Sequence, residues 1–193
     1  MESIYAIILI NVMIFFGSYV SSGPVADIID VFALSPAHVW SQPWTIVTSM
    51  FTHFDFTHIL FNMWALYFFG SAVLQILGAR RFWLVYMVGG ICGSLAFILL
   101  GKQHSYVIGA SGAIFALGGA LALLRPHVKV IFFPIPVPMP LWVGILLNFT
   151  IITILTIVLH MGIAWQAHLG GLLFGAAAGW FYKRRNLNAY RWN

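Results

Sequence analysis

The chain has 193 residues, of which 62% are hydrophobic and 7% are charged, and its formal net charge is +5. A soluble domain of this length cannot bury so much apolar surface, so the composition excludes a soluble protein and predicts a chain that crosses a membrane several times. The basic residues gather at the ends of the apolar segments. We therefore interpret the positive charge as a signal of membrane topology and expect no nucleic acid among the partners.

Six segments are apolar over the length that a membrane-spanning helix needs, about 20 residues, or nearly so. The first is short, but it lacks the cationic start and the cleavage site of a signal peptide, so we expect a retained helix. Pro134, Pro136, Pro138 and Pro140 cannot continue a helix and predict a connector between the fourth and fifth helices. The predicted helices span residues 4–19, 58–77, 82–100, 107–124, 141–159 and 166–182.

The basic residues predict the orientation of these helices. If six helices alternate in direction, Lys102 is the one Lys or Arg on its side of the membrane, and all the others lie on the opposite side. Cytoplasmic loops carry the excess of Lys and Arg. We therefore expect an all-α polytopic membrane protein with six transmembrane helices and both termini in the cytoplasm. Residues 1–193 would form a single membrane-embedded domain, with no separate soluble domain.

None of the four acidic residues lies inside a predicted helix. Glu2 is at the N-terminus, and Asp27, Asp30 and Asp55 lie in or beside the loop between the first and second helices. This distribution excludes an aspartyl protease, which needs two carboxylates in the membrane, and a His-Glu-x-x-His metalloprotease, which needs a glutamate base. A Ser-His-Asp triad would require Asp55 to reach the site, which we do not expect.

Two polar residues near the outer ends of apolar helices are the first functional candidates, because unpaired polar groups are costly in lipid. Ser111 lies in the stretch Gly109–Gly112 near the start of the fourth predicted helix, and His168 lies near the start of the sixth. At about 1.5 Å of rise per residue, both side chains and His58 of the second helix are expected at a similar depth. The sequence therefore predicts that these residues share one layer of the membrane.

Small residues predict how the fourth and sixth helices pack. Gly171 and Gly175 follow His168 at helical spacing, so they form a ridge on the same face of the sixth helix. Gly118 and Gly119 give the fourth helix a face of small residues, and such faces let helix backbones approach closely in lipid. Close packing would bring the serine to the histidine, and a serine activated by histidine alone is sufficient for catalysis in a dry, oriented site.

A nucleophile also needs donors for the negative charge that develops on the attacked carbonyl oxygen. His58 and Asn62 are one helical turn apart, so both can donate from one face of the second helix. The backbone amides of Ala110 and Ser111 are free at a helix start and can point toward the same place. We expect these groups to form the oxyanion site.

We expect no metal and no cofactor. A metal site built from His53, His58 and His168 would lack a carboxylate or thiolate ligand and the tight spacing of zinc sites. A transporter that uses the same histidines for proton relay would need charged groups within the helices and inverted repeats, and the sequence has neither.

The motifs resemble those of the rhomboid family of intramembrane serine proteases. Gly109–Gly112 resembles the family's Gly-x-Ser-Gly, residues 58–62 resemble its His-x-x-x-Asn, and Ala167-His168 with the following glycines resembles its last catalytic helix. The resemblance spans essentially the whole chain in the same motif order, and it is closest to the six-helix bacterial members. It implies an endopeptidase of the bacterial inner membrane, with an outward-facing active site, that cleaves membrane-protein substrates in or near their transmembrane segments.

The resemblance also implies a role for each residue. Ser111 would be the nucleophile and His168 the general base and then acid, while His58, Asn62 and the Ser111 amide would stabilise the oxyanion. The loop before His58 would be a lateral membrane-associated element, and the fifth helix with the loop at residues 161–165 would control substrate access.

Two positions depart from the family pattern. Thr45 follows Trp44 where many members have arginine, and Phe115 stands where bacterial members often have tyrosine. An inactive scaffold that binds transmembrane helices is the main alternative function. Such a protein should have lost Ser111 or His168, and this chain keeps both.

Overall fold

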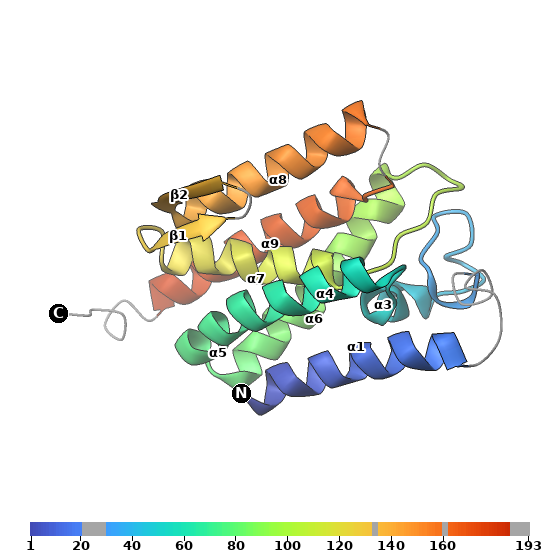
Figure 1. Cartoon of the computed structure of the whole chain (residues 1–193), viewed down its shortest axis with the longest axis horizontal. Coiled ribbons are helices and arrows are strands. Elements are labelled where there is room, and N and C mark those ends of the chain that lie inside the picture. The colour runs from blue at the N-terminus through green and yellow to red at the C-terminus, as the bar shows by residue number, and fades with distance from the viewer. Residues whose placement is uncertain (21–29, 133–134, 160–161, 186–193) are drawn as a thin grey trace.

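The computed structural model describes residues 1–20, 30–132, 135–159 and 162–185, and the chain is mostly helical (Figure 1). Long helices lie side by side as a bundle, and one hairpin of two short strands is attached to it. The elements in chain order are α1 (Glu2–Val20), α3 (Thr45–Thr48), η1 (Ser49–Phe51), α4 (Phe56–Ala65), η2 (Leu66–Gly70), α5 (Ser71–Leu77), α6 (Ala79–Leu100), α7 (Ser111–Leu124), β1 (Lys129–Phe132), β2 (Ile135–Pro140), α8 (Leu141–Val158) and α9 (Trp165–Arg185).

Three helical stretches are long and apolar enough to cross a membrane: Phe56–Leu77, Ala79–Leu100 and Leu141–Val158. The first of them runs continuously through α4, the π-helical η2 and α5. The helices α1 and α7 are apolar but shorter. The structure therefore agrees with the prediction of a helical membrane protein.

The fourth predicted helix begins later than its predicted start at residue 107. Val107 is not helical and instead pairs with Leu34 in an isolated β-bridge. Gly109 has a φ of +116°, and its N–H donates to the Ser49 carbonyl oxygen at 2.8 Å. Glycine tolerates this backbone conformation because it has no Cβ. The bonds to the first loop thus end the extended segment, and Ser111 is the first residue of α7.

The helix α7 forms the centre of the bundle. Every residue from Gly112 to Ala122 is buried, as expected of a helix that is apolar on all sides. Its 14 residues span about 21 Å, whereas the 22 residues of the neighbouring α6 span about 33 Å. A Cβ atom added to Gly93 of α6 would lie 3.5 Å from the Gly112 Cα atom, so these two residues are at one level. Because α6 continues from Gly93 to Leu100, the start of α7 lies about 10 Å short of the end of α6.

Glycines bring the backbones of α7 and α9 into contact. A Cβ atom added to Gly171 would overlap the Gly112 carbonyl oxygen, and one added to Gly175 would overlap the Ala116 carbonyl oxygen. The partner face of α7 differs in part from the one predicted. Gly119 does face α9, but Gly118 faces the Ile145 side chain of α8.

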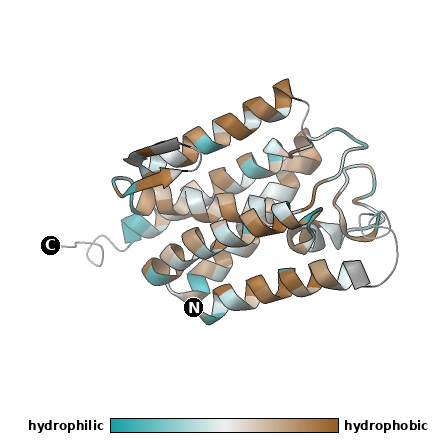
Figure 2. Ribbon diagram, in the orientation of Figure 1, coloured by the Kyte–Doolittle hydropathy of each residue, from teal (hydrophilic) through white to brown (hydrophobic). Residues whose placement is uncertain are grey.

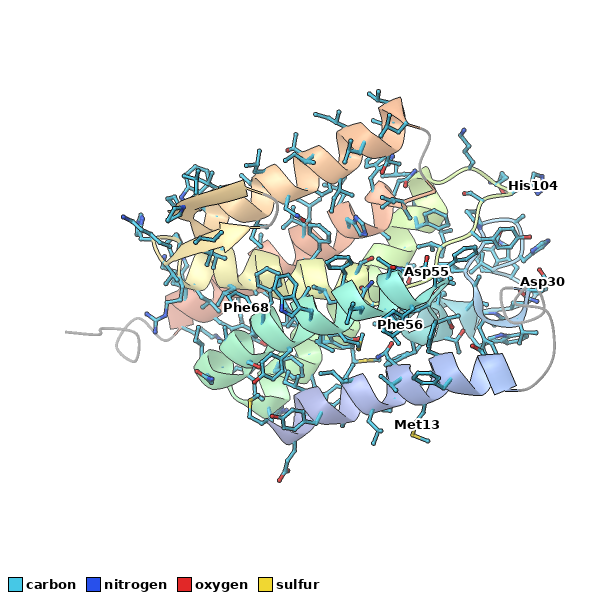
Figure 3. All side chains as sticks on the ribbon, viewed as in Figure 1. Met13, Asp30, Asp55, Phe56, Phe68 and His104 are labelled. Atoms are coloured by element: carbon cyan, nitrogen blue, oxygen red, sulfur yellow. The ribbon has the colours of Figure 1, made fainter. Side chains whose placement is uncertain are left out.

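The outside of the bundle is apolar. Hydrophobic residues cover the outward faces of the helices, and hydrophilic residues gather toward their ends (Figure 2). Leu99 is 81% exposed, and Met13 on α1 is exposed and points away from the bundle (Figure 3). Asp30 and His104 lie together at one end of the molecule. Such a surface is suited to lipid rather than water.

Replacing Gly175 by Val tests the contact between α7 and α9. The added side chain must displace the backbone at Ala116, and overpacking of this kind costs about 1–3 kcal/mol or more. We expect a lower midpoint of thermal unfolding in detergent micelles. The matched control is Leu173→Val on the exposed face of α9, which should unfold close to the wild type. A Gly175→Val protein that unfolds at the wild-type temperature would contradict this account of the packing.

Candidate active site

The structure places Ser111 and His168 in direct contact. Ser111 is the first residue of α7, and His168 lies in the first turn of α9. The Ser111 Oγ atom is 2.8 Å from His168 Nε2, a hydrogen-bond distance at which the hydroxyl can donate to an imidazole nitrogen that carries no proton. The close approach of α7 and α9 just below these two residues holds them at this distance.

The imidazole of His168 is held by packing rather than by a carboxylate. Its ring is buried and stacks on Phe115, with the ring centroids 4.6 Å apart and an interplanar angle of 26°. Phe149 of α8 contacts the edge of Phe115 in turn. His168 Nδ1 has no hydrogen-bond partner within the described residues, and Asp55 instead caps α4 by accepting from the His58 backbone N–H at 2.8 Å.

His58 faces the bend before Ser111. Its Nδ1 atom is 3.5 Å from the Phe54 backbone N–H, which donates to it, so the ring proton belongs on Nε2. Nε2 lies 2.7 Å from the position that a Cβ atom on Gly109 would occupy. A side chain at residue 109 would therefore displace the His58 ring, which adds a second reason for glycine at this position.

Asn62 lies one turn further along α4 and is buried. Its Nδ2 atom donates to the His58 carbonyl oxygen at 2.8 Å, and its Oδ1 atom has no partner in the described part of the chain. An amide nitrogen carries two hydrogens, so Nδ2 keeps one that can be donated elsewhere. The side chain thus supports the backbone at His58 and retains a free donor.

The backbone at the start of α7 borders a small cavity. Ala110 is the N-cap residue of α7, and the first N–H groups of a helix have no partner within it. The cavity beside them is lined by Ser111, Gly109, Ser49 and Ser94, among others. The sequence analysis did not identify Ser49 or Ser94. The signal for Ser94 was a hydroxyl inside an apolar helix, whereas only the fold brings Ser49 to Gly109.

His53 is a further residue whose position only the fold explains. It lies just before α4, is buried, and packs edge-on against the His58 ring with centroids 5.0 Å apart. Burial and, to a smaller extent, the neighbouring His58 lower the pKa of His53 from 6.5 to about 3. The ring is therefore a neutral support for His58 at ordinary pH. In the described ranges, no three His, Cys, Asp or Glu side chains come together as a metal site would require.

At Thr45, where the chain departs from the family pattern, the first loop is held by its own hydrogen bonds. Thr45 is buried and its Oγ1 donates to the Gln42 carbonyl oxygen at 2.6 Å, while Trp44 Nε1 donates to the Val31 carbonyl oxygen at 2.8 Å. Of the predicted access loop at residues 161–165, Met161 lies outside the described residues.

Comparison with known proteins gives one consistent result. The Rhomboid domain matches residues 40–185. "Rhomboid protein 1, mitochondrial" of Saccharomyces cerevisiae is 34% identical over 72% of this chain and 42% of its own length. "Rhomboid protease GluP" of Bacillus subtilis is 34% identical over 70% of this chain and 26% of its own length. "Putative rhomboid protease YdcA" of the same organism is 40% identical over 39% of this chain and 38% of its own length. The chain thus spans less than half the length of each of these relatives.

The lowered pKa of His53 predicts how stability depends on pH. Below pH 6.5 the unfolded chain binds a proton at residue 53, but the folded chain binds it only near pH 3. The contribution of neutral His53 to the free energy of unfolding is therefore fully present above pH 6.5. It is lost as the pH falls from 6.5 toward 3, by up to about 1.36 kcal/mol per pH unit. The free energy of unfolding in micelles should fall less steeply with acidification in His53→Phe than in the wild type.

The control for this measurement is His104→Phe, which changes an exposed imidazole and should keep the wild-type slope. Parallel curves for the wild type and His53→Phe would show that residue 53 does not contribute to the acid sensitivity.

Proposed function

The chain belongs to the rhomboid family of integral membrane proteins, and on that basis we propose that it is an intramembrane serine endopeptidase. Its substrates would be membrane proteins, cleaved in or near a transmembrane segment. The observation that carries the proposal is the 2.8 Å separation of Ser111 Oγ and His168 Nε2 at the start of two packed helices. A hydroxyl becomes a useful nucleophile when an adjacent base removes its proton, and this pair meets that requirement.

In the proposed reaction, Ser111 Oγ attacks the carbonyl carbon of the scissile peptide bond while His168 Nε2 takes its proton. His168 then gives that proton to the leaving amide nitrogen, the C–N bond breaks, and an ester to Ser111 remains. Water attacks the ester as His168 takes one of its protons. Return of the proton to Ser111 Oγ as the ester bond breaks restores the enzyme and releases the acid product.

The negative oxygen of the tetrahedral intermediate would lie beside the start of α7. The Ser111 amide is free there, Ala110 precedes it, and His58 Nε2 faces the same bend from α4. Asn62 would contribute its second amide hydrogen. Donors of this kind act strongly where water is excluded, because the local dielectric constant is low. Because His168 Nδ1 has no acidic partner among the described residues, the proposed catalytic unit is a dyad of serine and histidine.

The membrane placement follows from the same residues. We take the six helices to cross the membrane with both termini in the cytoplasm, in the inner membrane of a bacterium, so that the short α7 begins below the outer surface. Water would then reach Ser111 from the outside. The helix α8 is the least packed of the three long apolar stretches, because 17% of its residues are buried, against 33% and 39% of the most apolar 18 residues of the other two. A weakly packed helix is the easiest to displace, so α8 is the proposed side of access for the substrate helix.

Cleavage of a reconstituted transmembrane substrate tests this function. Ser111→Ala removes the nucleophile but leaves the fold intact, so we expect turnover to fall to the background level. Ser105→Ala is the matched control, because Ser105 lies in the preceding loop and its hydroxyl donates to the Lys102 carbonyl oxygen. This variant should cleave at the wild-type rate. Undiminished cleavage by Ser111→Ala, seen as the same product bands on a gel, would refute the proposal, and a wild type without any activity would favour the inactive scaffold.

A further inference from the structure

The hairpin of β1 and β2 has an unusual outer edge. Its register pairs Lys129 with Pro140 and Val130 with Met139, and the Leu141 N–H donates to the Val128 carbonyl oxygen at 2.8 Å. Residues of an antiparallel pair alternate between positions that exchange hydrogen bonds across the pair and positions that face outward. Pro140, opposite Lys129, is therefore an outward position of β2, and the register shifts between Val130 and Phe132.

Residues 136, 138 and 140 of β2 are all proline, which has no N–H group. At these three residues β2 therefore offers no backbone donor to a further strand or to water. An edge of this kind cannot extend a sheet. It can lie against a medium that provides no acceptors, where each unpaired N–H would be costly.

The hairpin also exposes large apolar side chains. Ile131 is 63% exposed and Val137 is 56% exposed, whereas Val130 of β1 packs against the buried core of the bundle. Lys129 is exposed beside them. The hairpin thus contacts the core of the bundle through Val130 and presents apolar groups with an adjacent cation to its surroundings.

The hairpin lies at the end of the bundle where α9 ends (Figure 1). There the Arg184 guanidinium lies over the Trp180 ring at 4.2 Å, and the Arg185 guanidinium lies over the Phe181 ring at 4.7 Å. Aromatic and basic residues together are typical of the layer where a membrane meets water. Asp30 lies at the opposite end of the molecule (Figure 3), whereas Glu2 at the start of α1 lies at the hairpin's end, where the basic residues outnumber it (Figure 1).

We infer that the hairpin rests in the headgroup layer of a bilayer that contains anionic phospholipids. In this placement Ile131 and Val137 lie against the acyl chains, the three prolines of β2 lie at the same level, and Lys129 lies among the phosphates. Basic residues next to a membrane are attracted to anionic headgroups, and for this reason we name anionic phospholipids as the lipid that the hairpin contacts. This inference concerns how the connector between α7 and α8 is placed, and it does not depend on proteolytic activity.

Fluorescent labelling at single positions tests the inference. In a Cys92→Ser background, we would introduce Ile131→Cys or Val137→Cys, attach the environment-sensitive dye NBD, and reconstitute the full chain in phosphatidylglycerol or phosphatidylcholine vesicles. The control is Lys102→Cys, in an exposed loop at the other end of the bundle. At positions 131 and 137 we expect blue-shifted emission, several-fold weaker quenching by aqueous iodide than at 102, and strong quenching by lipids that carry a nitroxide near the headgroup.

The blue shift and the protection from iodide should be larger in phosphatidylglycerol than in phosphatidylcholine vesicles. Combining Lys129→Glu with Ile131→Cys should remove this difference between the two lipids. Emission and iodide quenching at 131 and 137 equal to those at 102 in phosphatidylglycerol would overturn the inference. Equal blue shifts in both lipids would overturn its electrostatic part and leave an apolar contact alone. Because the dye reports its surroundings directly, neither result depends on activity.

Discussion

The contact between the backbones of α7 and α9 is the constraint on which the site depends. Glycines at 171 and 175 let α9 approach so closely that no side chain fits between the two helices. In lipid, where no hydrophobic force drives helices together, this dispersion contact is a main source of helix association. Because Ser111 and His168 both lie at the first turn of their helices, the packing that stabilises the bundle also sets the distance between hydroxyl and imidazole.

The second constraint is the length of α7. A helix of 14 residues spans about 21 Å, which is less than the hydrocarbon layer of about 30 Å in a bilayer. The non-helical segment from Val107 to Gly109 leads into the helix, and its bonds to Leu34 and Ser49 tie it to the first loop. The helix start, whose first amides have no partner within the helix, thereby lies next to His58. The small cavity lined by Ser49, Gly109 and Ser111 lies beside these amides.

Much of the helical architecture could be predicted from the sequence, because long apolar runs and glycines at helical spacing are local patterns. The start of α7 could not, since the conformation of Gly109 depends on a hydrogen bond to Ser49, 60 residues earlier in the chain. The prediction that Gly118 packs toward the sixth predicted helix was wrong for a similar reason. The spacing of residues along a helix shows which ones share a face, but not which neighbouring helix that face contacts. Prolines excluded a helix at 134–140 but did not reveal a strand, because pairing with β1 is what makes it one. The catalytic roles remain predictions that rest on the geometry of the site and on membership of the rhomboid family. They concern Ser111, His168, His58, Asn62 and Ala110.

The most direct measurement is covalent labelling by a serine-directed fluorophosphonate, followed by mass spectrometry of the modified peptide. Such a reagent reacts with a hydroxyl that a neighbouring base has activated, and it needs no knowledge of the natural substrate. The account predicts labelling of the reconstituted chain at Ser111, and no labelling when His168 is replaced by Ala. A chain that does not react, or one that reacts equally well without His168, would contradict the claim that these two residues form a catalytic dyad.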